Sequence, residues 1–259
     1  MINFKPDEIY RPGNVAFWML LSVTAGYLNA AGFLATGKFV SHVTGFGTQM
    51  GVSIAHEDYI FGGELLIIPI GFILGASVPS WYLEHQYSKD RVPRYFVIQG
   101  LICLGLLAVY FLGMRGLFGE FYTVADDQHD ILIIGILCFV CGMMNGLSTW
   151  STDGKIRVTH LTGLSTDIGI HLPKFFRKDG ASRFPEARKV NTVRILTFLS
   201  FSSGSLAAAF IFPLWGFQGF IFPVILSLFV FSVTLMSYRK ALKRHHRREE
   251  QKHRLKFVN

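Results

Sequence analysis

Two short stretches of the chain repeat one pattern of polar and small residues. Residues 42–51 read HVTGFGTQMG and residues 160–169 read HLTGLSTDIG, so both fit the pattern H-x-T-G-x-x-T-x-x-G. A histidine can donate, accept or carry a proton near neutral pH, and a threonine hydroxyl can donate and accept hydrogen bonds. The second copy adds a carboxylate, Asp167, where the first has Gln49. The pattern therefore predicts two related binding segments that differ in charge.

The residues around each Thr-Gly step predict a broken helix. The residues just before each step are rich in β-branched and aromatic types, which favours an extended arm. A short amphiphilic run follows, Phe46–Ala55 or Leu164–Leu172, and it is too short to cross a bilayer. We expect Thr44 and Thr162 to cap the starts of two half-helices, each with free backbone N–H groups pointing inward.

The rest of the chain is dominated by apolar runs of membrane-spanning length. Of the 259 residues, 51% are hydrophobic and only 16% are charged, against about 25% charged in soluble proteins. An uncharged helix of about 20 residues matches the hydrocarbon core of a lipid bilayer. Such runs lie at Val15–Ala35, Phe61–Leu83, Tyr95–Gly113, Ile131–Trp150, Ile195–Leu214 and Gly216–Tyr238. We predict an all-α polytopic membrane protein with six transmembrane helices in the bilayer.

The basic residues predict the orientation of these helices, because Lys and Arg are enriched in cytoplasmic loops. With both termini inside, all of the 25 Lys and Arg residues except Lys38 and Arg115 fall in cytoplasmic segments. The tail after Tyr238 is strongly basic and has no aromatic residues interleaved with its charges. We therefore expect it to contact anionic lipid head groups and no nucleic acid.

The internal repeat extends beyond the motif copies. Matched Gly-x-x-Asn steps precede the motifs and end at Asn29 and Asn145. Each half then reads as one span, a motif segment and two further spans. Since three crossings are an odd number, the halves would enter the membrane from opposite sides, as in the inverted repeats of many secondary transporters. The predicted units are a first repeat at 1–114, an outer connector at 115–129, a second repeat at 130–238 and a basic cytoplasmic tail at 239–259.

The candidate site lies where the two re-entrant segments approach each other. Asp167 and His160 are the candidate proton-coupling residues, since an ionisable group inside a membrane is costly and is a functional hypothesis by default. Alternatively, the histidines bind nearby backbone, the asparagines join helices and the glycines serve packing. The predicted substrate-binding residues are His42, Thr44, Gly45, Thr48, His160, Thr162, Gly163, Thr166, Asn29 and Asn145.

These features resemble the YoaK-like family of multi-pass bacterial membrane proteins, a domain of unknown function. The resemblance rests on the two Thr-Gly motifs, the Gly-x-x-Asn steps and the length, and it covers nearly the whole chain. It implies a bacterial inner-membrane location and no established substrate or activity. Members commonly carry an acidic residue in place of Asn29 and often an asparagine in place of Phe46, so the first half is less polar here.

Four functions are compatible with the sequence. The leading hypothesis is a secondary transporter of a small anionic or zwitterionic solute, with a proton as the coupling ion. The alternatives are a passive channel, a membrane scaffold and, least supported, an intramembrane enzyme, since no nucleophile–base set accompanies the motif. Cys138 and Cys141 lie in an apolar run and read as packing residues, so no metal or cofactor is predicted. A homo-oligomer and a full crossing by the motif segments both stay open.

Overall fold

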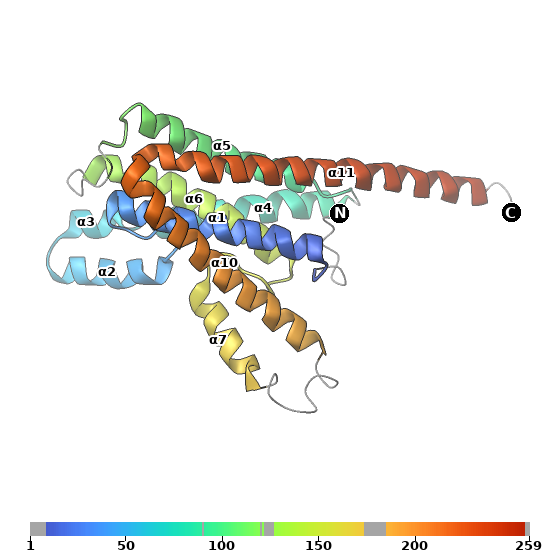
Figure 1. Ribbon diagram of the computed structural model, residues 1–259, viewed down its shortest axis with the longest axis horizontal. Helices are drawn as coiled ribbons and strands as arrows, with labels where there is room; N and C mark the ends of the chain where they lie inside the picture. The colour runs from blue at the N-terminus through green and yellow to red at the C-terminus, as the bar shows by residue number, and fades with distance from the viewer. Residues whose placement is uncertain (1–8, 90, 120, 122–126, 174–184, 257–259) are drawn as a thin grey trace.

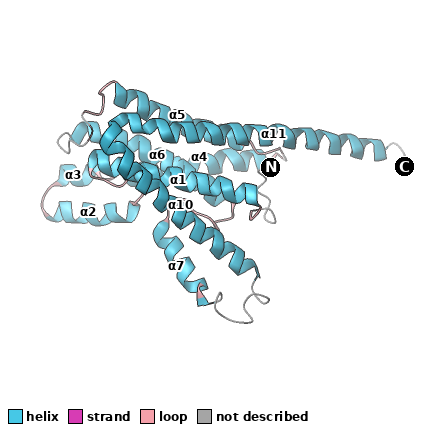
Figure 2. Cartoon of the chain, viewed as in Figure 1, coloured by secondary structure: helices cyan, strands magenta, loops and turns pink. Residues whose placement is uncertain are grey.

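The part of the chain that the structure describes is helical. The structure is a computed structural model that describes residues 9–89, 91–119, 121, 127–173 and 185–256. Figure 2 shows helices and connecting loops over these ranges, with no strand among them. The predicted all-α fold class is thus confirmed for the described residues.

The long helices coincide with the apolar runs of the sequence. They are α1 (Pro12–Thr36), α4 (Ile67–Ser88), α5 (Tyr95–Met114), α6 (Asp127–Ser151), α10 (Pro185–Trp215) and α11 (Ile221–Lys256). The shorter helices α2 (Val43–Ala55), α3 (Tyr59–Glu64) and α7 (Leu161–His171) lie between them, and the 3-10 helix η2 (Gly216–Phe220) joins α10 to α11. The motif copies therefore fall on α2 and α7.

Several of these helices are long and apolar enough to cross a membrane. The described segments that qualify are Pro12–Thr36, Tyr59–Ser88, Tyr95–Met114, Ile131–Ser151 and Ala187–His245. The last segment has 59 residues and includes both α10 and most of α11. The chain turns back between these two helices at η2, where Gly216 has a φ of +48° (Figure 1). A polytopic membrane protein is supported, and six separate crossings stay a prediction.

The long helices pack in pairs: α1 against α10, α4 against α6 and α5 against α11. The first pair makes a close crossing through two glycines. A Cβ atom at Gly26 of α1 would overlap the carbonyl of Phe201, and one at Gly204 of α10 would overlap the carbonyl of Val23. Because glycine has no side chain, the two backbones can touch at this point.

The pair formed by α4 and α6 crosses in the same way. A Cβ atom at Gly75 would overlap the carbonyl of Phe139, and one at Gly142 would overlap the carbonyl of Phe72. Glycine therefore sets the closest approach in both helix pairs.

The motif helices lie at the periphery of the bundle. In Figure 1, α1, α4, α5, α6 and α11 follow the long axis, and α10 crosses them obliquely. α2 begins partway along the bundle and runs back toward the end where α1 finishes. α7 also begins partway along the bundle, but it runs away from that end and lies beside α10. The start of α1 and the end of α11 point toward the same end, where α11 extends well beyond the other helices.

Candidate functional site

Non-helical arms lead into both motif helices. The first arm, residues 37–42, begins at Gly37, which has a φ of 70° and donates its N–H to the carbonyl of Phe33 at 2.8 Å. The second arm, residues 152–160, opens with a turn in which Asp153 and Gly154 have φ values of 52° and 74°. The predicted break in the helix is therefore present in both halves, and the turn that opens the second arm was not predicted.

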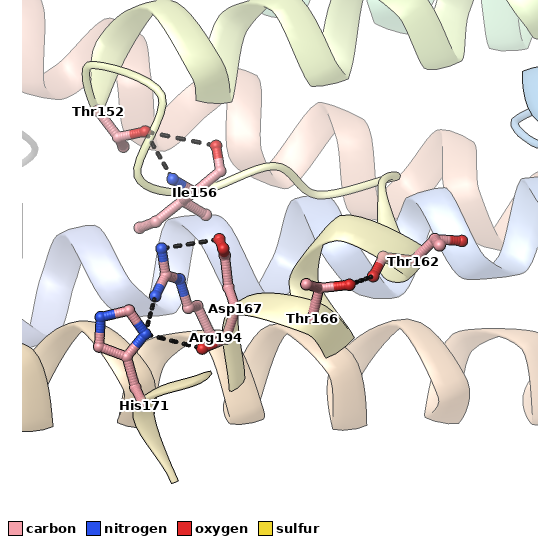
Figure 3. Close-up of polar contacts among 7 residues, drawn as sticks. All are labelled: Thr152, Ile156, Thr162, Thr166, Asp167, His171 and Arg194. Carbon is pink, nitrogen blue, oxygen red and sulfur yellow. Dashed lines mark hydrogen bonds and ion pairs between the residues drawn. The ribbon is translucent and has the colours of Figure 1, made fainter. Parts of the chain in front are cut away.

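A threonine at the end of the preceding helix anchors each arm. Thr36 Oγ1 donates to the carbonyl of Gly32 at 2.9 Å and accepts from the N–H of Lys38 at 3.3 Å. In the second half, Thr152 Oγ1 lies 2.7 Å from the carbonyl of Ser148 and accepts from the N–H of Ile156 at 3.0 Å (Figure 3). Each hydroxyl thus ties the start of the arm to the last turn of a long helix.

A histidine is the N-cap of each motif helix. His42 and His160 precede the first helical residues, with φ and ψ of −99° and 64° in His42 and −103° and 68° in His160. The prediction that Thr44 and Thr162 cap the helices is wrong. Both threonines already lie in the first helical turn, whereas a cap must have a non-helical backbone.

The glycine of each Thr-Gly step makes room for the imidazole of this histidine. A Cβ atom at Gly45 would lie 3.0 Å from His42 Nδ1, and one at Gly163 would lie 2.9 Å from His160 Nδ1. Each ring therefore lies against the first turn of its helix. The H-x-x-G spacing in both motif copies is the sequence signal from which this contact could have been predicted.

The two asparagines have different surroundings. Asn29 Oδ1 accepts from the backbone N–H of Ser41 at 3.1 Å and from the hydroxyl of Ser41 at 2.9 Å. Asn145 Oδ1 is buried without a hydrogen-bond partner, and so is Thr149 Oγ1 one turn later. Asn29 therefore holds the first arm, and Asn145 makes no equivalent bond to the second.

Asp167 forms an ion pair with an arginine of α10. Arg194 Nη2 lies 2.8 Å from Asp167 Oδ2, and Arg194 Nη1 lies 3.4 Å from His171 Nδ1 (Figure 3). His171 Nδ1 also lies 2.8 Å from the carbonyl oxygen of Asp167. The side chain of Arg194 is 11% exposed and that of Asp167 is 46% exposed. This ion pair attaches α7 to α10.

The sequence analysis missed Arg194 and its neighbour Asn191 as site residues. Arg194 directly precedes the apolar run that starts at Ile195, so the sequence analysis placed it in a cytoplasmic segment with the other basic residues. In the structure α10 begins at Pro185, so Arg194 lies within the helix, and its side chain is mostly covered. Asn191, one turn earlier, is fully buried, and its amide oxygen and nitrogen have no partner. An Asn and an Arg at i and i+3 beside an apolar run were the available signal.

Positive charge surrounds Asp167. A hollow of about 70 Å³ between the second arm and α7 is lined by Gly154, Lys155, Arg157, Gly163, Leu164 and Asp167. Lys155 and Arg157 face this hollow from the arm, and Arg194 holds the carboxylate of Asp167 from α10. Among the described residues that line the hollow, two are cationic and one is a carboxylate, a composition that favours an anion or a zwitterion.

The hydroxyls and imidazoles of the motif copies lie on exposed surfaces. The exposed residues are His42, Thr44, Thr48, His160, Thr162 and Thr166, whereas Asn29, Gly45, Asn145 and Gly163 are partly buried. Thr166 Oγ1 donates to the carbonyl of Thr162 at 3.1 Å, within its own helix (Figure 3). Over the described ranges no hydrogen bond or ion pair joins α2 to α7, so a site shared by both copies stays a prediction.

Metal ligands are not clustered among the residues that the structure describes. No group of three or more His, Cys, Asp or Glu side chains there could hold a metal ion. Cys138 and Cys141 are buried in α6 as free thiols.

Comparison with known proteins identifies the family. No curated protein and no solved structure matches the chain. A family model described as a protein of unknown function, DUF1275, matches residues 17–233, which include both motif copies. This match confirms the resemblance to the YoaK-like family. The chain therefore belongs to the DUF1275 family of proteins of unknown function.

Proposed function

We propose that the protein is a secondary transporter of a small anionic or zwitterionic solute in a bacterial inner membrane. The observation that carries this proposal is the broken segment of the second half, where a cationic hollow lies between the non-helical arm and α7, and the mostly covered Arg194 of α10 pairs with Asp167. Non-helical backbone at membrane depth is tolerated where it is buried in protein or lines a cavity. Ionisable residues in such places mark solute and proton pathways.

The proposed architecture is two inverted three-span repeats with both termini in the cytoplasm. Matched contacts support it: Gly26 and Gly142 occupy equivalent positions, and each crosses a phenylalanine carbonyl of the partner helix. Equivalent helices also run in opposite directions in Figure 1, since α1 and α6 are antiparallel along the long axis. Each motif helix returns toward the end from which its arm came, as a re-entrant segment must.

We assign solute contact to the motif residues and coupling to two ionisable groups. The solute would contact the exposed His and Thr residues and the partly buried Gly45 and Gly163 of the two copies, with Asn29 and Asn145 at the arms. Asp167 and His160 would carry the proton. Protonation of Asp167 would neutralise it and weaken its attraction to Arg194, which links proton uptake to the position of α7.

Uptake by reconstituted vesicles tests this function. The full-length protein would be given labelled amino acids, carboxylates and phosphate, with and without an imposed proton gradient. We expect one class to accumulate above empty vesicles only with the gradient, and Asp167→Asn to abolish that dependence. Flux that ignores the gradient would instead identify a channel, and a chemically altered product an enzyme. If nothing accumulates, the transport proposal fails.

Thiol labelling tests the inverted topology. Single cysteines at the exposed positions Thr48 and Thr166 would be placed in a protein lacking Cys103, Cys138 and Cys141. A membrane-impermeant reagent should reach Thr48→Cys from outside and Thr166→Cys from inside. Labelling of both from the same side would mean parallel halves and would contradict the inverted repeat.

The charge of the basic tail supports its assignment to the cytoplasm. The length of the tail limits how much of it can contact lipid. The guanidinium of Arg94 lies 6.0 Å from the ring centroid of Tyr238, and Arg94 is the residue before α5 begins, so Tyr238 lies beside the start of α5. From Tyr238, α11 continues to Lys256, about 27 Å away at about 1.5 Å per residue. A head-group layer is about 5–8 Å thick. We therefore propose that the first basic turns after Tyr238 bind anionic lipid and that the distal turns extend past the head groups.

A further inference from the structure

We propose that Arg194 binds the carboxylate of the solute, and that Asp167 is an internal counter-ion which this carboxylate replaces. The inference rests on the proposed transport function and names its solute class, a small carboxylate-bearing molecule such as an amino acid. It assigns Arg194 and Asn191 to the site, and it makes the attachment of α7 to α10 depend on whether solute is bound.

The ion pair has one buried partner and one accessible partner. Arg194 is 11% exposed on a long helix of the bundle, whereas Asp167 is 46% exposed on a peripheral helix whose one buried residue is Leu164. The arginine is therefore fixed by its surroundings, and the aspartate is the partner that can leave.

The ion pair also leaves donors of Arg194 unused. Nη2 binds Asp167 Oδ2, Nη1 is 3.4 Å from an imidazole nitrogen, and Nε is buried without a partner. A guanidinium presents its N–H groups as a planar fork that matches both oxygens of a carboxylate. A free carboxylate can therefore bind this fork more completely than Asp167 does in the structure.

Asn191 provides a second unused group on α10. Its side chain is fully buried, and neither its amide oxygen nor its amide nitrogen has a partner. Residues at i and i+3 share a helix face, so Asn191 and Arg194 lie side by side. Buried polar groups without partners are rare and costly. A solute with a carboxylate and an ammonium or hydroxyl group would satisfy both residues.

The first half provides a matched control. In the motif copies Gln49 stands at the position of Asp167. Downstream of them, Phe72-x-x-Gly75 aligns with Phe201-x-x-Gly204, and this alignment places Leu65 at the position of Arg194. α2 consequently has no ion pair to lose, and its arm is held by Asn29 through Ser41. A carboxylate should therefore release α7 and leave α2 in place.

Distances between spin labels test this exchange without any transport. One pair of labels would join Thr166 of α7 to Leu199 of α10, and the control pair would join the equivalent positions Thr48 and Ile70; all four are exposed. The purified full-length protein would be measured in chloride, acetate and glycine at one ionic strength. We expect acetate and glycine to increase the longer-distance population of the first pair about tenfold, and to leave the control pair unchanged.

Variants separate carboxylate binding from a merely structural ion pair. Asp167→Asn should show the longer distance in chloride and respond no further. Arg194→Lys keeps the charge without the fork and should raise the midpoint for acetate about tenfold. Asn191→Ala should raise the midpoint for glycine more than that for acetate.

Two results would overturn the inference. One is a wild-type protein whose Thr166–Leu199 distance ignores both acetate and glycine. The other is a carboxylate response that survives in Arg194→Lys with an unchanged midpoint, which would place the carboxylate elsewhere. A distance response without uptake would keep this inference and reject transport, whereas uptake without a distance response would reject this inference alone.

Discussion

In the first half of the molecule, Asn29 holds the arm through two hydrogen bonds from Ser41, whereas in the second half Asn145 makes no such bond and Asp167 holds the motif helix to Arg194. The two glycine crossings are alike, and each joins a long helix of one half to a long helix of the other. Thr152 holds the second arm as Thr36 holds the first, so the halves differ in the further contact that each adds. A neutral bond from backbone to side chain fixes the first segment, and an ion pair that a solute or a proton can disrupt fastens the second.

The largest effects should come from the crossings that the halves share. Alanine at Gly26 or Gly142 would drive a Cβ atom into a backbone carbonyl, which cannot move like a side chain. We expect each substitution to lower the free energy of unfolding by about 3 kcal/mol, measured as loss of thermal stability of the purified protein. Gly47→Ala and Gly169→Ala are the controls, because a Cβ atom there meets open space. If Gly26→Ala or Gly142→Ala costs no more stability than Gly47→Ala, the close glycine crossing is contradicted.

The next largest effect should be confined to the second half. Arg194→Gln removes the buried partner of Asp167, and we expect it to cost about 2 kcal/mol of stability. Asp167→Asn should cost about 1 kcal/mol, because Asp167 is nearly half exposed. In a double-mutant cycle the two costs should not add, since both variants remove one interaction. Additive costs would show that the ion pair contributes nothing to the attachment of α7.

Replacing the matched asparagines should cost more stability in the first half than in the second. Asn29→Ala removes the acceptor of two hydrogen bonds and should cost about 1–2 kcal/mol. Asn145→Ala should cost less than about 0.5 kcal/mol, because its amide oxygen has no partner to lose. Thermal unfolding of the two variants side by side measures the difference. Equal costs would mean that the second arm is held by Asn145 after all.

The smallest effects should be equal in the two motif copies. A Cβ atom at Gly45 or Gly163 meets only the end of an exposed imidazole, which can rotate away. We expect Gly45→Ala and Gly163→Ala each to cost less than about 1 kcal/mol. His42→Ala or His160→Ala in the same protein should restore the loss. If the histidine substitution restores nothing, the imidazole is not the group that the glycine accommodates.

The sequence predicts the helices well because their signal is local. An uncharged run of about 20 residues must be helical in a bilayer, and α5 (Tyr95–Met114) accordingly matches the run Tyr95–Gly113. Helices that continue outside the apolar run are not bounded by it: α10 begins ten residues before Ile195, and α11 ends 18 residues after Tyr238. The repeat likewise indicated where the helices break. The N-cap was mispredicted because threonine is a common cap, and composition does not reveal that the backbone is already helical at Thr44 and Thr162.

The site was harder to predict because its contacts join distant parts of the chain. Asp167 stood out as the one carboxylate of the motif copies, but its partner lies on another helix and looks like a loop charge in the sequence. Asn29 and Asn145 are equivalent by sequence, and only the positions of Ser41 and the second arm make them different. Local patterns fix which residues are polar, and packing decides which of them meet.

The glycine crossing of α1 and α10 is a point about which α10 could tilt. The two backbones touch at Phe201 and Gly204, so a tilt of α10 about this point would keep the contact, whereas sliding α10 along α1 would move the glycines apart. Arg194 lies about 10 Å from Phe201 along the helix, so a tilt of about 10° would swing it by about 2 Å. A displacement of Arg194 of this size would break the 2.8 Å ion pair with Asp167 while α1 and α10 stay in contact at the crossing. A rocking α10 would thus open or close the link to α7 without breaking any contact at the pivot.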